Sequence, residues 1–175
     1  LMERYKVPHF DAKGEADAIF RELGVPTTFL RTSFYWDNFI HFGMGPRRGD
    51  DAVLSLALPA GDKRLAGIAA EDIGRCALGI LREGATMIGK TVGIAGDHLT
   101  GDEMAAAMGR ALGEGVRYQD VPGEVDRSLG FPGADDLGNM FQYYQHFAGE
   151  FGGARPLDAT RALNPALQSF EQWVA

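Results

Sequence analysis

The sequence predicts an α/β fold built on a doubly wound parallel sheet. Apolar side chains recur at intervals of three and four residues from His9 to Leu23, and Gly24 follows, so this segment is expected to form an amphipathic helix. Residues 25–32 are rich in β-branched and aromatic side chains, with Pro26 near the start, which indicates a buried strand. A helix followed directly by a strand is half of a βαβ crossover, the repeating unit of parallel sheets.

Strands and helices continue to alternate along the rest of the chain. Residues 52–59 and 65–69 are expected to form two short strands around a turn, and residues 70–82 show the pattern of an amphipathic helix. Thr100 and Glu103 match a capping box, in which each side chain bonds the backbone amide of the other residue, so a helix begins there. The other expected elements are strands at 90–95 and 116–121, helices over 100–112, 123–128, 134–147 and 166–174, and a loop at 149–156.

Composition and charge narrow the classes of partner. The 175 residues are 45% hydrophobic and 23% charged, which is enough to bury one core. The formal charge is −7, and binding to nucleic acid requires clustered lysines and arginines, so we expect neither nucleic acid nor a membrane as a direct partner. The lone cysteine, Cys76, lies in an apolar helical pattern and is expected to pack as a small hydrophobe, which fits a reducing cytoplasm.

Three segments carry a resemblance to a known family. They are residues 7–15 with the sequence VPHFDAKGE, residues 24–39 with GVPTTFLR and FYWDNF, and residues 129–144 with LGFPGADDLGNMFQYY. These segments resemble the NmrA-like family of atypical short-chain dehydrogenases/reductases, which bind NADP(H). The third segment most resembles the redox-sensor subgroup of NmrA-like family domain-containing protein 1. The resemblance implies the C-terminal part of an NAD(P)-binding Rossmann-like sheet with a smaller mixed α/β lobe, and a cofactor in the cleft between them.

The resemblance also implies how the chain is organised. Proteins of this family begin with a glycine-rich turn after the first strand, and no such turn precedes Leu1, so we expect the C-terminal part of a longer protein. The chain is expected to form a single unit. Residues 1–50 and about 65–98 would belong to the Rossmann-like lobe, and residues about 51–64 and 99–175 mainly to the smaller lobe. Because the phosphate-binding turn is missing, this chain alone should bind NADP(H) poorly.

His9 and Lys13 form the first candidate site. They are four residues apart on the first expected helix, so they share one face and can act on one ligand. Short-chain dehydrogenases carry a Tyr-x-x-x-Lys pair on the matching helix, in which tyrosine donates a proton and lysine binds the nicotinamide ribose. The resemblance therefore implies that Lys13 contacts the cofactor. His9 replaces the tyrosine, so it is a candidate proton donor or only a hydrogen-bond partner of the cofactor.

The second candidate group follows the expected strand at its carboxyl end, where open parallel sheets place their ligand crevice. The resemblance implies that Tyr35, Trp36, Asp37 and Asn38 pass the nicotinamide end of the cofactor, with Asn38 the best match to the family. Trp36 and Asp37 depart from the commonest family pattern. The alternative interpretation is an aromatic-rich helix start that only packs against the second lobe.

The segment 92–101, with the sequence VGIAGDHLTG, has a superficial likeness to a dinucleotide-binding turn. Its glycine spacing differs from G-x-G-x-x-G, and Asp97, Asp102 and Glu103 would place carboxylates where a pyrophosphate should bind, so a capped structural helix is the better interpretation. The histidines other than His9 are not spaced as metal ligands, and no nucleophile stands beside a base. We therefore expect neither a metal site nor a hydrolase.

Three functional hypotheses remain open from the sequence. The first is an NADP(H)-binding regulatory or redox-sensing protein that works without turnover and has a regulatory protein as its partner. The second is an NADPH-dependent reductase of a small carbonyl or quinone-like substrate, which keeps Lys13 as cofactor ligand and uses His9 or water to deliver the proton. The third is a protein-interaction module that has lost its cofactor, because a fold alone does not determine a function.

Overall fold

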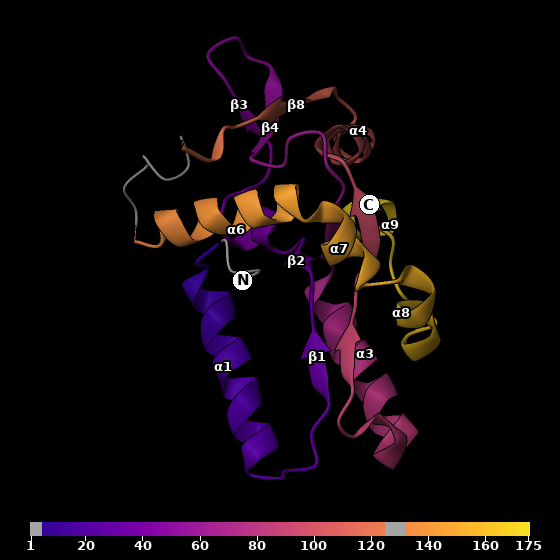
Figure 1. Ribbon diagram of the computed structural model, residues 1–175. Coiled ribbons are helices and arrows are strands. Elements are labelled where there is room, and N and C mark those ends of the chain that lie inside the picture. Colours follow the sequence, from indigo (N-terminus) through magenta and orange to yellow (C-terminus); the bar gives the residue numbers. More distant parts are fainter. Residues whose placement is uncertain (1–4, 125–131) are drawn as a thin grey trace.

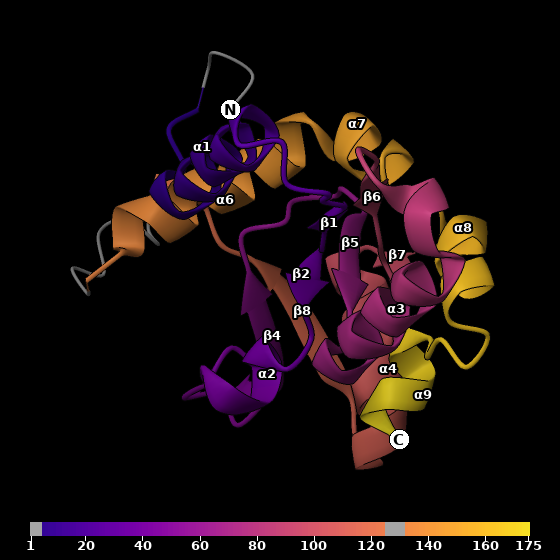
Figure 2. The ribbon, with the colours of Figure 1, turned by 90° about the horizontal axis from the view of Figure 1, so that it is seen from below.

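Three small sheets form the β-structure of the computed structural model, counted over the residues that it describes, 5–124 and 132–175. β1 (Phe29–Arg31) pairs in parallel with β6 (Thr91–Gly93). In the second sheet, β5 (Leu65–Ile68) lies between β2 (Phe34–Tyr35), which is parallel to it, and β7 (Asp97–Leu99), which is antiparallel. Figures 1 and 2 show helices packed around these strands. The α/β class predicted from the sequence is confirmed.

The third sheet lies at the opposite end of the molecule from the free end of α1 (Figure 1). β4 (Leu54–Leu58) is its central strand and is parallel to β8 (Val116–Asp120) and antiparallel to β3 (Arg47–Arg48). The two strands expected around residues 61–63 are therefore present as β4 and β5, but they belong to different sheets. Short-range patterning predicts a strand, whereas its partner is chosen by the tertiary packing.

The capping box is confirmed at the start of α4 (Gly101–Leu112). The Glu103 amide donates to Thr100 Oγ1 at 3.2 Å, and the Thr100 amide donates to Glu103 Oε2 at 2.9 Å. α4 buries Met104 and Met108 against β4 and β8. The cap and the apolar face of this helix are both encoded within its own segment, so the sequence alone predicts the helix.

The helix expected over 70–82 is confirmed as α3 (Ala70–Glu83), and a short 3₁₀ turn, η1 (Gly84–Met87), follows it. Cys76 is fully buried on α3, as the apolar pattern predicted. α8 (Leu157–Leu163), which the sequence did not predict, packs directly on α3. The approach is so close that a Cβ atom on Gly79 would lie 2.3 Å from the carbonyl oxygen of Leu163, so only glycine fits there.

The first expected helix is confirmed as α1 (Pro8–Glu22), with its proline in the first turn. The apolar face that was expected to be buried is largely open, however. No residue of α1 is fully buried, and Ile19 and Leu23 are 56% and 71% exposed. The reason is that β1 is paired only with β6 among the described residues, and a cavity separates α1 from β1.

Two expectations for the C-terminal third are wrong. Residues 149–156 were expected to form a loop, but α7 (Ala148–Gly153) occupies most of this segment. Phe151 of α7 is buried against Tyr144, with ring centroids 4.6 Å apart, and this contact outweighs the low helix propensity of the flanking glycines. The last helix, α9 (Phe170–Val174), begins later than expected because Ser169 caps it through the amide of Gln172.

α6 (Ala134–His146) confirms the helix expected over 134–147, and Figure 1 shows it crossing above one end of α1. α2 (Asn38–His41) is a single helical turn after β2. Residues 125–128 of another expected helix lie outside the described residues. No helix in the described ranges is long and apolar enough to cross a bilayer. The expected boundaries between two lobes stay a prediction. One core cluster contains Trp36 and Phe170, which that prediction assigns to different lobes.

Candidate functional site

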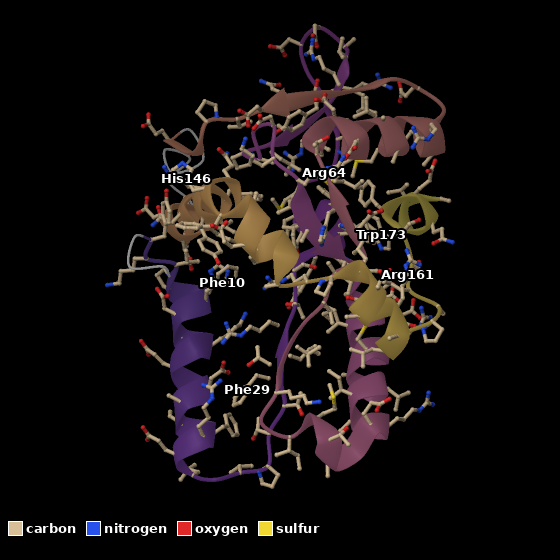
Figure 3. The ribbon with its side chains drawn as sticks, turned by 45° about the vertical axis from the view of Figure 1, so that its right-hand side comes forward. Phe10, Phe29, Arg64, His146, Arg161 and Trp173 are labelled. Atoms are coloured by element: carbon tan, nitrogen blue, oxygen red, sulfur yellow. The ribbon has the colours of Figure 1, made fainter. Side chains whose placement is uncertain are left out.

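A cavity of about 610 Å³ lies between α1, β1, α6 and α7. Phe10 and Phe29 contribute aromatic walls from α1 and β1, and Figure 3 shows Phe10 nearer to the α6 end and Phe29 nearer to the far end of α1. Tyr143 and Phe151 close the α6 end, with ring centroids 6.0 Å apart in an edge-on contact. The volume lies within the range of small-molecule and cofactor sites, so this is the candidate functional site.

Charges of both signs line the cavity. The cations are Lys6, Lys13, Arg31 and Arg155, and the anions are Asp11, Glu15 and Asp17. Arg31 Nη2 contacts Asp17 Oδ2 at 3.1 Å, but the arginine side chain is 54% exposed, so this pair contributes at most about 1 kcal/mol. Lys13 makes no ion pair within the described ranges. Its ammonium group is therefore available to a ligand.

His9 lies one helical turn before Lys13 and is held by a carboxylate from α6. Its Nδ1 lies 2.7 Å from Asp136 Oδ1, and its backbone amide donates to Asp136 Oδ2 at 3.3 Å. Because an ionised carboxylate only accepts hydrogen bonds, Nδ1 is the donor in this contact. The sequence analysis missed Asp136. His9 and Asp136 are 127 positions apart in the chain, and sequence spacing predicts contacts only between residues close in the sequence.

Tyr35 and Trp36 follow β1 but point to different environments. Tyr35 is 38% exposed, and its hydroxyl lies 3.1 Å from Thr32 Oγ1 at the carboxyl end of β1. Trp36 is only 2% exposed, and its ring packs edge-on against Phe170 with centroids 5.2 Å apart. A Cβ atom on Gly67 would lie 2.2 Å from Trp36 Nε1, so this glycine makes room for the indole. The geometry of Trp36 favours the packing interpretation.

Asp37 and Asn38 lie at the starts of two helices. Asp37 Oδ2 accepts a hydrogen bond from the backbone amide of Ala70 at 2.7 Å, so it caps the first turn of α3. Asn38 is half-buried and begins α2. The cavity walls include Lys13 but none of the four residues from Tyr35 to Asn38. The structure thus brings one of the predicted cofactor ligands into the cavity and places the others beyond its edge.

Arg155 is the main residue of the cavity that the sequence analysis missed. It is 8% exposed, and its Nε and Nη1 donate at 2.9 Å to the carbonyl oxygens of Thr32 and Phe151. The guanidinium lies 3.5 Å from the centroid of the Phe151 ring, a cation–π distance. Burial lowers the pKa of Arg155 below its usual range. Nothing local in the sequence signals this residue, because it follows two glycines in the segment expected to be a loop.

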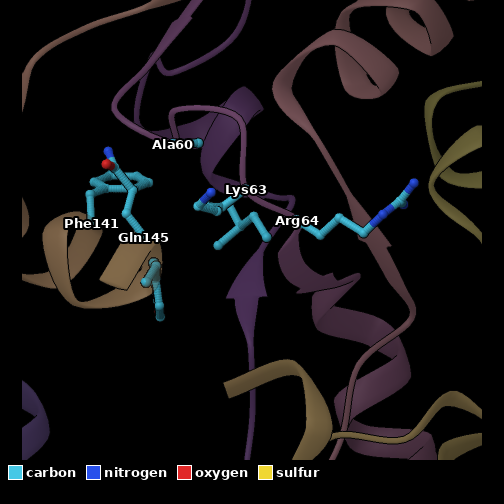
Figure 4. A pocket seen from close by; sticks show the side chains of 7 residues that line it. Ala60, Lys63, Arg64, Phe141 and Gln145 are labelled. Atoms are coloured by element: carbon cyan, nitrogen blue, oxygen red, sulfur yellow. The ribbon is translucent and has the colours of Figure 1, made fainter. Parts of the chain in front are cut away.

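A second cavity near β4 and β5 is much smaller. Figure 4 shows Ala60, Lys63, Phe141 and Gln145 around it, and its volume is about 10 Å³. That volume approaches the minimum for a single water molecule, so the space does not accommodate a cofactor. Gln145 Nε2 already donates to the carbonyl oxygen of Pro59 at 2.8 Å. The larger cavity beside α1 therefore remains the candidate site.

Solved structures of similar fold bind nicotinamide cofactors. The structure of NmrA, a negative transcriptional regulator, in complex with NADP has a TM-score of 0.71 and 22% identity, and the match covers 90% of this chain and 54% of that one. Triphenylmethane reductase of Citrobacter sp. complexed with NADP(H) gives 0.76 and 20%, covering 98% and 60%. The NADPH-dependent quinone oxidoreductase QOR2 of Escherichia coli gives 0.71 and 21%, covering 98% and 62%. These likenesses show the fold.

Sequence comparison agrees with the structural similarity. An NmrA-like family domain-containing oxidoreductase, lnbB, of Aspergillus flavus is 33% identical over 92 residues, which are 53% of this chain and 28% of that protein. The chain thus spans little more than half of the similar solved structures named above and a smaller part of this relative. The model of the NmrA-like family matches residues 2–173, so the chain belongs to the NmrA-like family, whose fold it shares with NAD(P)-binding proteins.

Proposed function

We propose that this chain is the C-terminal part of an NADP(H)-binding regulatory protein that senses cofactor occupancy without turnover. The observation that carries the proposal is the position of Lys13 on the wall of the 610 Å³ cavity, where it has no ion-pair partner among residues 5–124 and 132–175. An ammonium group on this wall can donate hydrogen bonds to ribose hydroxyls. The complex of NmrA with NADP supports the choice of cofactor.

The residue that replaces the tyrosine supports a role without turnover. His9 is engaged through Nδ1 by Asp136, and its ring is not part of the cavity wall. A proton donor must lie within hydrogen-bond reach of the reacting atom, and a residue outside the wall does not meet that requirement in this conformation. The proposal therefore assigns cofactor binding to Lys13 and assigns no proton transfer to His9.

A route from the cofactor to a protein partner also exists in the contacts of α1. Besides the link between His9 and Asp136, Asn139 Nδ2 of α6 donates to the carbonyl oxygen of Lys6 at 3.0 Å. A cofactor that pulls on Lys13 would move α1, and these two bonds would pass the displacement to α6. Such a change in the surface of α6 is the proposed signal to a regulatory protein.

Titration of the full-length protein with NADPH and NADH tests the proposal. We expect NADPH to bind and Lys13→Ala to weaken binding by about tenfold, because a charge-assisted hydrogen bond is lost. Lys63→Ala is the matched control, since Lys63 pairs with Asp62 far from the cavity, and it should leave affinity unchanged. Equal affinities for all three proteins would contradict the assignment of Lys13. Absence of NADPH binding would overturn the proposed function.

The alternative function is reduction of a small carbonyl or quinone-like substrate with NADPH. It is favoured by similarity to triphenylmethane reductase and to the quinone oxidoreductase. Oxidation of NADPH by the full-length protein, measured with a panel of carbonyls and quinones, separates the two. Turnover that His9→Ala abolishes, while NADPH affinity is kept, would replace the sensor with a reductase. Binding of NADPH without turnover would support the sensor.

A further inference from the structure

Arg155 is a buried cation that has no counter-ion among the described residues. Its exposed fraction is 8%, and its hydrogen bonds in the described structure go to the carbonyl oxygens of Thr32 and Phe151. No carboxylate of the described residues pairs with it, whereas seven other arginines and lysines of the described residues each contact one. Carbonyl dipoles compensate only part of the cost of burying a charge.

The surroundings of Arg155 confirm this electrostatic imbalance. Desolvation is the largest cause of its lowered pKa, and the nearby cation Arg31 lowers that pKa further. The groups that act in the opposite direction are the phenols of Tyr143 and Tyr144, which burial keeps neutral by raising their own pKa values. An arginine stays protonated even so, because its usual pKa lies far above neutral pH. The site therefore carries uncompensated positive charge.

The guanidinium also has donors that no described residue uses. It carries five N–H groups, and Nε and Nη1 together supply the two recorded hydrogen bonds. Nη2 makes no hydrogen bond within the described ranges. It is nevertheless in contact with solvent, because Ser33 Oγ is the one fully buried side-chain atom of the described residues that lacks a partner. Because Arg155 is one of the residues that line the large cavity, these donors belong to a side chain that a ligand in the cavity would contact.

Aromatic rings surround the same end of the cavity. Phe151 lies under the guanidinium, and Tyr143 packs against Phe151. Thr32, whose carbonyl orients Arg155, stands at the carboxyl end of β1, where parallel sheets place their ligands. A planar ligand with one anionic group would satisfy both features, because its ring would contact the aromatic side chains and its anion would accept from the guanidinium.

We propose that Arg155 binds the anionic group, a carboxylate or a phosphate, of a small aromatic or unsaturated ligand that shares this cavity with the cofactor. The inference rests on the proposed function, since it names the class of effector or substrate that accompanies NADP(H). Lys13 serves the cofactor and Arg155 serves the second ligand. The fork of two parallel donors distinguishes planar carboxylates from neutral amides of the same shape.

The test is a calorimetric titration of the full-length protein with benzoate, phenyl phosphate and neutral benzamide, with and without saturating NADP⁺. We expect at least one anion to bind about tenfold or more tightly than benzamide, because a charge-assisted bond is made only with the anion. Preference for benzoate or for phenyl phosphate separates a carboxylate ligand from a phosphate ligand. Equal binding of benzamide and both anions, or no binding of either anion, would overturn the proposal.

Variants of Arg155 test whether this residue causes the preference for anionic ligands. Arg155→Gln should remove the preference for anions, and Arg155→Lys, which keeps the charge but loses the fork, should retain a reduced preference. Arg161→Gln on α8 is the control, because this exposed arginine does not line the cavity, and it should behave as wild type. Anion binding that survives in both Arg155 variants contradicts the assignment. If Arg155→Gln does not fold, Arg155→Lys decides alone.

The two proposals fail in different ways. If the wild-type protein does not bind NADP⁺ but still prefers an anion through Arg155, the proposed function is wrong and the anion site stands. If NADP⁺ binds and Lys13→Ala weakens it, while no anion is preferred, the anion site is wrong and the proposed function stands. Measuring both ligands on the same preparations therefore assigns each failure to its own residue.

Discussion

The α1 side of the molecule and the region around α4 are built from similar helices but are packed very differently. α4 buries five of its residues in a region where it contacts β8, α9 and β4, whereas α1 buries none. In the α4 region, the Tyr118 hydroxyl lies 3.1 Å from the carbonyl oxygens of both Leu58 and Gly61, which share its one proton as acceptors. On the α1 side, Lys13 has no ion-pair partner among the described residues, and Ile19 is 56% exposed.

The difference shows where stability and binding are located. Side chains of the α4 region pack against and hydrogen-bond one another, so substitutions there should change the stability of the fold. Side chains around the α1 cavity have unused donors and unburied surface, so changes there should alter binding with little effect on folding. Three predictions on stability, in order of decreasing effect, compare the α1 cavity with the buried parts of the molecule, which are the α4 region and the buried face of α3.

The largest effect is expected from a core truncation in the α4 region. Leu56 of β4 is fully buried, so Leu56→Ala should lower the free energy of unfolding by about 2–5 kcal/mol, because it removes buried methyl groups and leaves a cavity. Ile19→Ala on α1 is the matched change and should cost less than about 1 kcal/mol in this chain. Urea unfolding measures both. Equal losses in this chain would show that the two regions are packed alike.

A smaller effect is expected from buried and exposed carboxylates. Asp72 is fully buried and accepts hydrogen bonds from Asn164 Nδ2 at 2.8 Å and the Gln168 amide at 3.0 Å. Asp72→Ala should cost about 3 kcal/mol, because it leaves those donors unpaired. Asp17→Ala at the cavity should cost less than about 1 kcal/mol, since its arginine partner is exposed. Thermal unfolding compares them, and a cost for Asp17→Ala as large as that for Asp72→Ala would break the contrast.

The smallest effect near neutral pH is expected from Cys76. Burial, with a further contribution from the charge of Asp72, raises the pKa of its thiol to about 11. The folded thiol thus keeps its proton to a higher pH than the unfolded thiol, whose pKa is about 8.5. Its contribution to stability is complete below that pH and is lost as the pH rises toward 11.

Thiol labelling checks this last expectation. At pH 8, Ellman's reagent should react with Cys76 only in urea, where the chain is unfolded, because only the thiolate reacts and the side chain is fully buried. Stability measured by urea unfolding should fall between pH 8.5 and pH 10, and a Cys76→Ala variant should lack this part of the pH dependence. Rapid labelling of the folded protein at pH 8 would contradict the buried thiol.

Elements with a complete local signal were predictable from the sequence. Periodic apolar residues placed α1 and α3 within a few residues of their observed bounds, and the Thr100 and Glu103 pair placed the start of α4. α7 was not predictable, because its glycines disfavour a helix and the burial of Phe151, which stabilises it, comes from another helix. Segments that rely on distant contacts carry no local signal.

The candidate site divides in the same way. The sequence by itself determined the α/β class, because short-range periodicity encodes it. Through a resemblance to the NmrA-like family it also led to the prediction that Lys13 contacts the cofactor, because that prediction depends on a motif contained within one helix. Only the tertiary structure decided that Trp36 is buried in the core, that Asp136 holds His9 and that Arg155 lines the cavity with no carboxylate partner in the described part of the chain. Burial and charge compensation depend on neighbours distant in the chain, and no local pattern encodes them.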